Sequence, residues 1–531
     1  MLQDNLLLII SLLLAVSMLS MLSEKLRISY PIFLVLAGLL ISIIPGIPHL
    51  SLNPDMVFLI FLPPLLFEAS WNTSWHEFLF FRRPIGMLAF GLVILTACVV
   101  AVISSMMIPG FTLALGFLLG GIISPPDAVA ATSVLKELRI PKTVVTILEG
   151  ESLVNDASSL IVFRVALASI LTGQFVLWKA GVDFLLVSSL GVLTGLVIAH
   201  IIYAIYRFLP TTASIDTAIS LISPYLMYIT AEHFHYSGVL SVVSGGLFLS
   251  FRSADIFSYS SRLQVQGVWN TLAFLLNGVV FIMIGLQLPD IVSGLEGEYA
   301  LSSAIGYGVV ISAAAIVLRM LWVFPGAYMP RLLSKKVKKR EQRPGWKSVF
   351  ILGWSGMRGV VSLASALAIP FTLGGGGPFP HRNLILFITF TVILITLVLQ
   401  GLSLPLLIRY LKIEVHENEA EQEQAIRLRL ATSTLEYLQS EYTQEVSSID
   451  AYARIKERYE RMIEIASKKL AQEESEEDRS FGLPKYRKML LDLVAVRRKE
   501  LAKMHHEKEY TDRLIRKKQN ELDLEEARLR R

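Results

Sequence analysis

The chain has 531 residues, of which 53% are hydrophobic and 18% are charged, and its formal net charge is +5 at pH 7. Its one cysteine, Cys98, excludes an intrachain disulfide and a cysteine-based metal site, and its 9 histidines show no metal-ligand spacing. The distribution of the apolar residues argues against a soluble protein, because long apolar runs alternate with short polar connectors through about residue 410.

Apolar runs of about 20 residues match a hydrocarbon core about 30 Å thick, so the sequence predicts an all-α polytopic membrane protein. We expect about thirteen transmembrane helices, at residues 5–22, 30–45, 54–70, 86–108, 111–134, 143–171, 180–206, 213–232, 236–251, 265–288, 300–328, 347–370 and 384–411. The first run follows Asp4 and lacks both a basic segment and a small-residue cleavage site, so we interpret it as a retained span.

Lysine and arginine gather in alternate connectors between these spans. The odd-numbered connectors hold Lys25, Arg27, Arg82, Arg83, Lys136, Arg139, Lys142, Arg207, Arg252, Arg262 and the basic segment 331–347, whereas the even-numbered connectors hold Lys179 and Arg382. Because basic loops stay on the cytoplasmic side, we expect the N-terminus outside and the C-terminal tail in the cytoplasm. The pattern favours a plasma membrane, of the bacterial inner-membrane type.

The last part of the chain differs in composition. Residues 412–531 are rich in Glu, Lys and Arg, and their apolar residues recur at helical spacing, with a break expected near Phe481–Pro484. We therefore divide the chain into a transmembrane domain, 1–411, and a cytoplasmic helical or coiled-coil tail, 412–531. The tail is expected to pack on itself or on a second copy.

Two of the expected spans are interrupted by glycine and proline. The breaks hold Gly120, Gly121, Pro125, Pro126 and Asp127 in the fifth span, and Gly356, Arg358 and Gly359 in the twelfth. Interrupted helices at corresponding places in two inverted repeats indicate a transporter site near the bilayer midplane. Glycine and proline are also common in membrane helices, but that reading leaves Asp127 and Arg358 unexplained. Each charge can neutralise the helix ends that face each other at a break.

The sixth span carries several polar residues on one face, because Glu149, Ser152, Asp156 and Ser159 recur at three- and four-residue steps. Asp156 and Ser152 offer a carboxylate and a hydroxyl one turn apart, which suits Na⁺ or a proton better than a soft metal. Asn155 can donate a hydrogen bond to the exposed backbone of the fifth span without titrating.

Other charges in the spans need partners or an exit to water. Glu151 needs a buried cation, and both Arg319 and Arg358 are candidates, a choice that spacing leaves open. Glu68 faces either the same cavity or the cytoplasmic mouth of the third span. Arg164 and Asp183 are interpreted as residues that reach the membrane interface.

Four stretches together carry a resemblance to a known family. They are FLPPLLFEA (61–69), SPPDAVAA (124–131), EGESLVNDA (149–157) and WSGMRGVVSLASAL (354–367), and they are similar to the signatures of the sodium/proton exchanger family of monovalent cation:proton antiporters, in its bacterial-type form. The resemblance covers the membrane part and leaves the tail without a counterpart. It implies a homodimer whose protomers have a dimerisation part and a core with two crossing broken helices, working by an elevator-like movement.

The resemblance also implies roles for individual residues. Asp156 matches the aspartate that binds the ion and the proton, Asn155 its preceding asparagine, and Ser152 the neighbouring serine. Asp127 matches the aspartate of the broken helix, and Glu151 the glutamate that pairs with a core arginine. Arg319 and Arg358 fall where the family has arginines. One departure is that Pro126 precedes Asp127, where the family usually has a proline after this aspartate.

These observations predict an antiporter that exchanges Na⁺, or Li⁺ or K⁺, for H⁺ at Asp156 and serves pH homeostasis. A single titrating carboxylate beside Asn155 predicts electroneutral 1:1 exchange. K⁺/H⁺ exchange by the same mechanism is an alternative, and an intramembrane aspartyl protease that uses Asp127 and Asp156 is a distant one. An ion channel is disfavoured because no filter sequence is present. We expect no enzymatic activity, no cofactor and no nucleic-acid partner, with membrane lipid as the surroundings.

Overall fold

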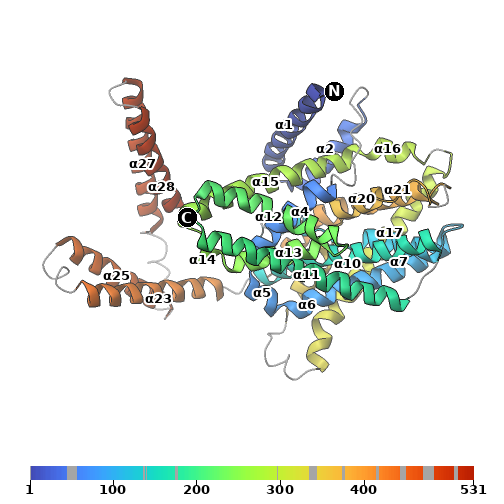
Figure 1. The fold of residues 1–531 in the computed structure, drawn as a ribbon. Helices are drawn as coiled ribbons and strands as arrows, with labels where there is room; N and C mark the ends of the chain where they lie inside the picture. Colours follow the sequence, from blue (N-terminus) through green and yellow to red (C-terminus); the bar gives the residue numbers. More distant parts are fainter. Residues whose placement is uncertain are drawn as a thin grey trace. The chain divides into compact units, whose positions relative to one another are not determined.

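The computed structural model describes residues 2–44, 57–135, 138, 140–173, 177–295, 297–333, 344–373, 377–413, 418–442, 450–470, 483–507 and 512–530. These residues form helices and two isolated β-bridges, and no strand occurs among them (Figure 1). Lys136, Arg139, most of the basic segment 331–347 and half of the predicted break at 481–484 lie outside the described residues. Contacts divide the chain into two compact units, Met1–Val415 and His416–Arg531.

The helices of the first unit form two groups, of which one is termed the scaffold. It comprises α1 (Leu2–Leu26), α2 (Tyr30–Ser42), η1 (Val57–Phe61), α4 (Leu62–Asn72), α5 (Trp75–Phe80), α11 (Leu177–Phe208), α12 (Ala213–His233), α13 (Gly238–Phe251), α14 (Ser253–Ile256), α15 (Tyr259–Leu286) and α16 (Leu288–Ser293). Helix α15 packs against α1 and α2, and α13 packs against α4, α11 and α12. Phe67, Met227 and Val242 belong to the apolar cluster that these helices bury.

The other group is called the core. It comprises α6 (Arg82–Gly86), η2 (Met87–Leu92), α7 (Val93–Met107), α8 (Leu113–Ile123), α9 (Ala128–Leu135), α10 (Lys142–Thr172), α17 (Leu301–Leu333), α19 (Trp346–Trp354), α20 (Val360–Leu367), α21 (Arg382–Ile395), η3 (Thr396–Gln400) and α22 (Gly401–Leu411). Helix α8 packs against α7 and α10, while α17 packs against α19 and α21. The core thus holds two sets of the same kind, each with a broken helix between two long ones.

Local sequence explains where the long central helix of the core begins and ends. Helix α10 starts after Pro141, whose fixed φ suits a helix entry, and stops at Gly173, which has a φ of +70°. A left-handed residue at this position favours glycine because it lacks a Cβ atom. The helix therefore runs unbroken for 31 residues through the middle of the unit.

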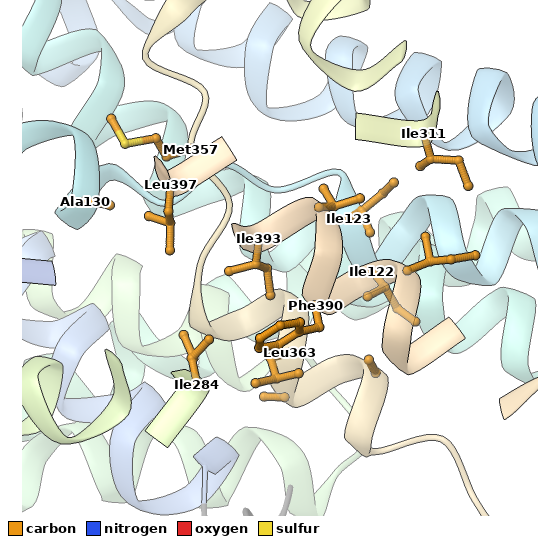
Figure 2. Close-up of a cluster of buried hydrophobic side chains, with 14 of the residues drawn as sticks. Ile122, Ile123, Ala130, Ile284, Ile311, Met357, Leu363, Phe390, Ile393 and Leu397 are labelled. Carbon is orange, nitrogen blue, oxygen red and sulfur yellow. The ribbon is translucent and has the colours of Figure 1, made fainter. Parts of the chain in front are cut away.

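Apolar side chains from both broken helices meet in the core. Figure 2 shows Ile122 and Ile123 of α8, Leu363 of α20, and Phe390 and Ile393 of α21 in one buried cluster. Each of these side chains is at most 2% exposed. Their burial places the two breaks inside protein, where freed backbone groups can find protein partners instead of lipid.

The first unit has the apolar helices of a multi-pass membrane protein. Seven helices of the described residues are long and apolar enough to cross a membrane, and shorter apolar helices occur at Tyr30–Ser42, Phe58–Asn72, Leu113–Ile123 and Gly238–Phe251. The described residues in each of the thirteen predicted ranges are mainly helical, and the fifth and twelfth ranges each hold two helices separated by a break. The number of membrane crossings stays a prediction, as does the orientation of the N-terminus.

The second unit contains two helical hairpins. Helix α23 (Asn418–Glu441) packs against α25 (Asp450–Leu470), and α27 (Leu483–Glu507) packs against α28 (Asp512–Arg530) (Figure 1). Arg497 pairs with Glu525 at 2.6 Å across the second hairpin. Coiled-coil pairing of this tail with a second copy stays a prediction, and so does its cytoplasmic location.

Candidate ion-binding site

The two broken helices meet backbone to backbone. Pro126, in the break between α8 and α9, forms an antiparallel bridge with Arg358, in the break between α19 and α20. The Asp127 N–H donates to the Met357 carbonyl at 2.7 Å. Each break therefore supplies hydrogen-bond partners for the other, as a break at membrane depth requires.

Charged side chains lie at the helix ends around this crossing. The Asp127 carboxylate accepts a hydrogen bond from Val129 N–H at 2.8 Å and so caps the start of α9. The Arg358 guanidinium donates to the Ser124 carbonyl, directly after the last residue of α8. A carboxylate at a helix N-terminus and a cation at a C-terminus each oppose the local helix dipole. Asp127 and Arg358 thus lie at the helix ends of the breaks, and their role in neutralising those ends stays a prediction.

Glycines allow the close approaches at the crossing. A Cβ atom at Gly359 would lie 1.9 Å from an Asp127 carboxylate oxygen, and one at Gly356 would lie 2.3 Å from Cδ of Arg319. Gly120 and Gly121, predicted as part of the break, lie inside α8. Their Cβ positions would come within 2.6 Å of Ala97 Cα and 3.0 Å of Phe163 N, so they serve the packing of α8 on α7 and α10. Pro125 and Pro126 do lie at the break.

Helix α10 is tied to the first break by two polar side chains. The Asn155 amide donates to the Pro126 carbonyl at 3.0 Å, and the Ser152 hydroxyl accepts from Ala128 N–H at 3.3 Å. The contact of Asn155 with the first break was predicted from the sequence, whereas Ser152 was expected to be a cation ligand. Both contacts stabilise backbone groups that the interruption between α8 and α9 leaves without helical partners.

Asp156 follows Asn155 and is 8% exposed. Among the described residues, its carboxylate forms no hydrogen bond and no ion pair with another side chain. The Asn155 side-chain oxygen is also buried without a partner. Buried polar oxygens are normally satisfied, so unpaired oxygens next to a helix crossing are typical of a place for water, a proton or a small cation.

Glu151 lies one turn before Asn155 and has a partner from the other half of the core. Its carboxylate forms a two-pronged ion pair with Arg319 of α17, at 2.5 Å and 2.8 Å, and both side chains are 1% exposed. Arg319 also donates to the Leu352 carbonyl at 3.3 Å, near the end of α19. Of the two arginines that spacing left open, the structure pairs Glu151 with Arg319.

Glu68 lies in α4, on the scaffold side. Its carboxylate accepts from the Asn72 amide at 2.6 Å in α4. The Tyr30 hydroxyl, at the start of α2, interacts electrostatically with both Glu68 and Asp127. Tyr30 was not singled out from the sequence, because a tyrosine at the start of an apolar run is common.

Thr396 is a second residue that the sequence analysis missed. Its hydroxyl accepts from Arg358 N–H at 3.0 Å and is fully buried in η3. A threonine inside the apolar run 384–399 carries no sequence signal for this role. Its signal is structural, since η3 is a π-helical segment, and such segments often occur at functional sites.

Arg164 joins the core to the scaffold on the outer part of α10. It donates to both carboxylate oxygens of Glu232 in α12, at 2.9 Å and 2.7 Å, and Glu232 also accepts from Gly238 N–H at 3.1 Å. The two side chains are 44% and 29% exposed. Asp183, the other charge assigned to an interface, is exposed on α11.

We expect Arg164→Ala to lower the free energy of unfolding by no more than about 1 kcal/mol, because partly exposed ion pairs contribute little. Glu232→Ala should cost more, because it also removes the hydrogen bond to Gly238 N–H. Thermal unfolding of the purified variants in detergent measures both. A loss for Arg164→Ala as large as that for Glu232→Ala would contradict this order.

Comparison with known proteins identifies the family of this chain. Residues 9–410 match the family described as sodium/hydrogen exchanger, transmembrane. The chain belongs to the sodium/hydrogen exchanger family. This is a family of cation:proton antiporters and not of enzymes, which rules out the aspartyl protease considered from Asp127 and Asp156.

Relatives within the exchanger family include two proteins named sodium, potassium, lithium and rubidium/H⁺ antiporter. The one from Bacillus pumilus is 35% identical and the one from Bacillus subtilis 37% identical, each over 68% of this chain and 55% of its own length. The chain thus matches little more than half of each. The Na⁺/H⁺ antiporter ApNhaP of Aphanothece halophytica is 31% identical over 70% of this chain and 69% of its own length.

A solved structure of an exchanger has the same fold. The sodium proton antiporter MjNhaP1 from Methanocaldococcus jannaschii superposes with a TM-score of 0.59, covering 75% of this chain and 99% of its own, at 19% identity. The predicted all-α antiporter fold is thereby confirmed, apart from the exact number of helices.

Proposed function

We propose that this protein exchanges a monovalent cation, Na⁺ or alternatively Li⁺ or K⁺, for H⁺ across the membrane, with both substrates binding at Asp156. One observation carries the proposal: a buried carboxylate without a side-chain partner lies beside the crossing of two broken helices. The names of the Bacillus relatives add Rb⁺ to the cations that deserve a test.

Competition for one carboxylate accounts for coupled exchange. Either a cation or a proton neutralises Asp156, and only the neutral site crosses the apolar barrier at low cost, since a charge at the bilayer centre is expensive. Asn155 and Ser152 hold the break of α8–α9 beside it, and Asp127 and Arg358 balance the helix ends there. The Glu151–Arg319 pair fastens α10 to α17, so Asp156 moves together with the rest of the core.

The stoichiometry follows from the neighbour of Asp156. An asparagine at 155 leaves one titrating carboxylate there, so one proton is exchanged for one cation and no net charge moves. The membrane potential then contributes nothing, whereas each uncompensated charge would contribute about 2.3 kcal/mol per 100 mV. Glu68 is a further carboxylate within electrostatic reach of Tyr30, so the variant Glu68→Gln belongs in the test of stoichiometry.

The division of the helices supports alternating access of the elevator kind. In this scheme the core, with α8–α9, α10 and α19–α20, slides against a scaffold that is held in a homodimer within the lipid bilayer. The basic connectors support an orientation with the N-terminus outside and the tail in the cytoplasm of a plasma membrane. Such an exchanger would serve pH homeostasis.

The test is proton flux in proteoliposomes with an imposed pH gradient, to which Na⁺, Li⁺, K⁺ and Rb⁺ are added in turn. We expect cation-triggered dissipation for the wild type that does not change when the membrane potential is clamped. Asp156→Asn should reduce it to the level of protein-free liposomes, because the variant cannot take up a proton. Asp183→Asn, the same change at an exposed aspartate of α11, serves as the control. Flux that survives in Asp156→Asn would refute the assignment of the site.

A further inference from the structure

An apolar cavity lies among helices of the scaffold, with one residue of the core, Val154 of α10, in its wall. Its volume is about 530 Å³, and its walls come from α5, α10, α11 and α13. The lining side chains are apolar except for His200, Ser244 and Arg252. His200 stacks on Phe248 with ring centroids 4.1 Å apart, so the histidine ring itself forms part of an aromatic wall.

The lining residues of the cavity follow one side of α13 along most of its length. Its lining extends from Leu240, near the start of that helix, to Arg252, just past its end. Twelve residues at 1.5 Å each correspond to about 18 Å. One leaflet of a bilayer whose hydrocarbon core is about 30 Å thick measures about 15 Å. The groove therefore has the length of a single hydrocarbon chain in one leaflet.

One end of the groove carries positive charge. The Arg252 side chain is 45% exposed, and its nearest carboxylate, Asp255, lies 3.3 Å away and is itself 50% exposed. Its guanidinium lies 5.5 Å from the centre of the Phe251 ring, which also lines the groove. A guanidinium with free donors at the edge of an apolar groove fits a phosphate group.

The charged end coincides with the cytoplasmic side in the proposed orientation. Arg252 and Trp75 both follow spans whose next connectors are basic, and tryptophan favours the interface between lipid and water. The cytoplasmic leaflet is the one that carries anionic lipids. Charge, length and apolar lining thus select the same occupant.

We propose that this groove binds an anionic phospholipid of the cytoplasmic leaflet, with one acyl chain along α13 and the phosphate at Arg252. The acyl chain fills the apolar space of the groove. The headgroup replaces or shares the weak contact of Arg252 with Asp255.

The bound lipid would touch both moving parts of the exchanger. Val154, next to Asn155 in α10, lines the groove from the core side, whereas Leu196 and Ser244 line it from the scaffold side. A lipid held here contacts both walls and resists their relative sliding. This consequence for transport rests on the proposed function, whereas the binding itself does not.

The test counts bound lipids on the purified full-length protein by native mass spectrometry after addition of phosphatidylglycerol or phosphatidylcholine with the same chains. The wild type should prefer phosphatidylglycerol. Arg252→Gln should weaken this preference about fivefold, the value of one basic side chain at an anionic surface. Arg262→Gln, an arginine of the same cytoplasmic region that does not line the groove, should leave the preference unchanged.

A second pair of variants tests the groove itself. Leu196→Trp places bulk inside it and should remove one bound lipid of either headgroup, whereas Leu193→Trp, on the exposed part of the same helix, should remove none. An equal lipid count in Leu196→Trp and the wild type, or an unchanged preference in Arg252→Gln, overturns the proposal. Because the count needs no transport, loss of flux in every preparation would refute the exchanger function and leave this result intact.

Discussion

Arg319→Met should destabilise the protein by about 3–5 kcal/mol, because it leaves the Glu151 carboxylate buried without a counter-charge. Both side chains are 1% exposed, and two short hydrogen bonds join them. The measurement is thermal unfolding in detergent, monitored as the fraction of protein that stays monodisperse.

A matched set of variants separates charge from shape in this pair. Glu151→Met together with Arg319→Met removes both charges and should recover much of the stability, since replacing a whole buried pair by apolar residues is often neutral. Arg319→Lys keeps the charge and loses the two-pronged geometry. Its stability should therefore lie between that of Arg319→Met and that of the wild type. If Arg319→Met is no less stable than Arg164→Ala, the pair does not stabilise the core as proposed.

Gly359→Ala should be the most damaging replacement of a glycine by alanine among those at the crossing. The new methyl group would lie 1.9 Å from an Asp127 carboxylate oxygen and 2.6 Å from Asp127 Cβ. The two breaks must separate to admit it, which disturbs the hydrogen bond from Asp127 N–H to Met357 and the cap at Val129. We expect a loss of stability of about 1–3 kcal/mol or more, and loss of exchange in proteoliposomes.

Gly345 provides the control for this prediction. It caps the first half of the same broken span, and a Cβ atom there would meet nothing within 4 Å. Gly345→Ala should therefore cost only what alanine costs at a helix N-cap, about 1 kcal/mol, and should leave exchange intact. Combining Gly359→Ala with Asp127→Gly removes the clashing side chain and should restore folding while exchange stays absent. Full exchange in Gly359→Ala alone would show that the crossing is not as tightly packed as described.

The general arrangement was accessible from the sequence because it depends on local signals. Pro125-Pro126 and the glycines around Arg358 interrupt apolar runs, and both mark real breaks. An amide side chain at Asn155, inside a long apolar helix, was enough to expect a hydrogen bond to the first break, which Asn155 makes. The contact of Ser152 with Ala128 N–H was not expected.

The remaining features depend on tertiary packing, which the spacing of residues along the sequence does not reveal. Arg319 and Arg358 were equal candidates for Glu151, and in the structure the Arg319 side chain passes close to Gly356, which has no Cβ atom in its way, to reach Glu151. Gly120 and Gly121 read as a break because glycine has the same signature whether it ends a helix or lets two helices approach. The contact of Thr396 with Arg358 N–H could not be predicted, because a single threonine in an apolar run carries no signal for it.

The crossing also constrains how the protein can be made. The Ser124 carbonyl receives its hydrogen bond from Arg358, 234 residues later in the chain. A ribosome that has just released α8, α9 and α10 into the membrane has not yet synthesised that partner. The first half must wait in the bilayer with polar backbone groups exposed, each at a cost of several kcal/mol, until the second half arrives. The hydrogen bonds of the first break are therefore completed only when the second half of the chain is in place.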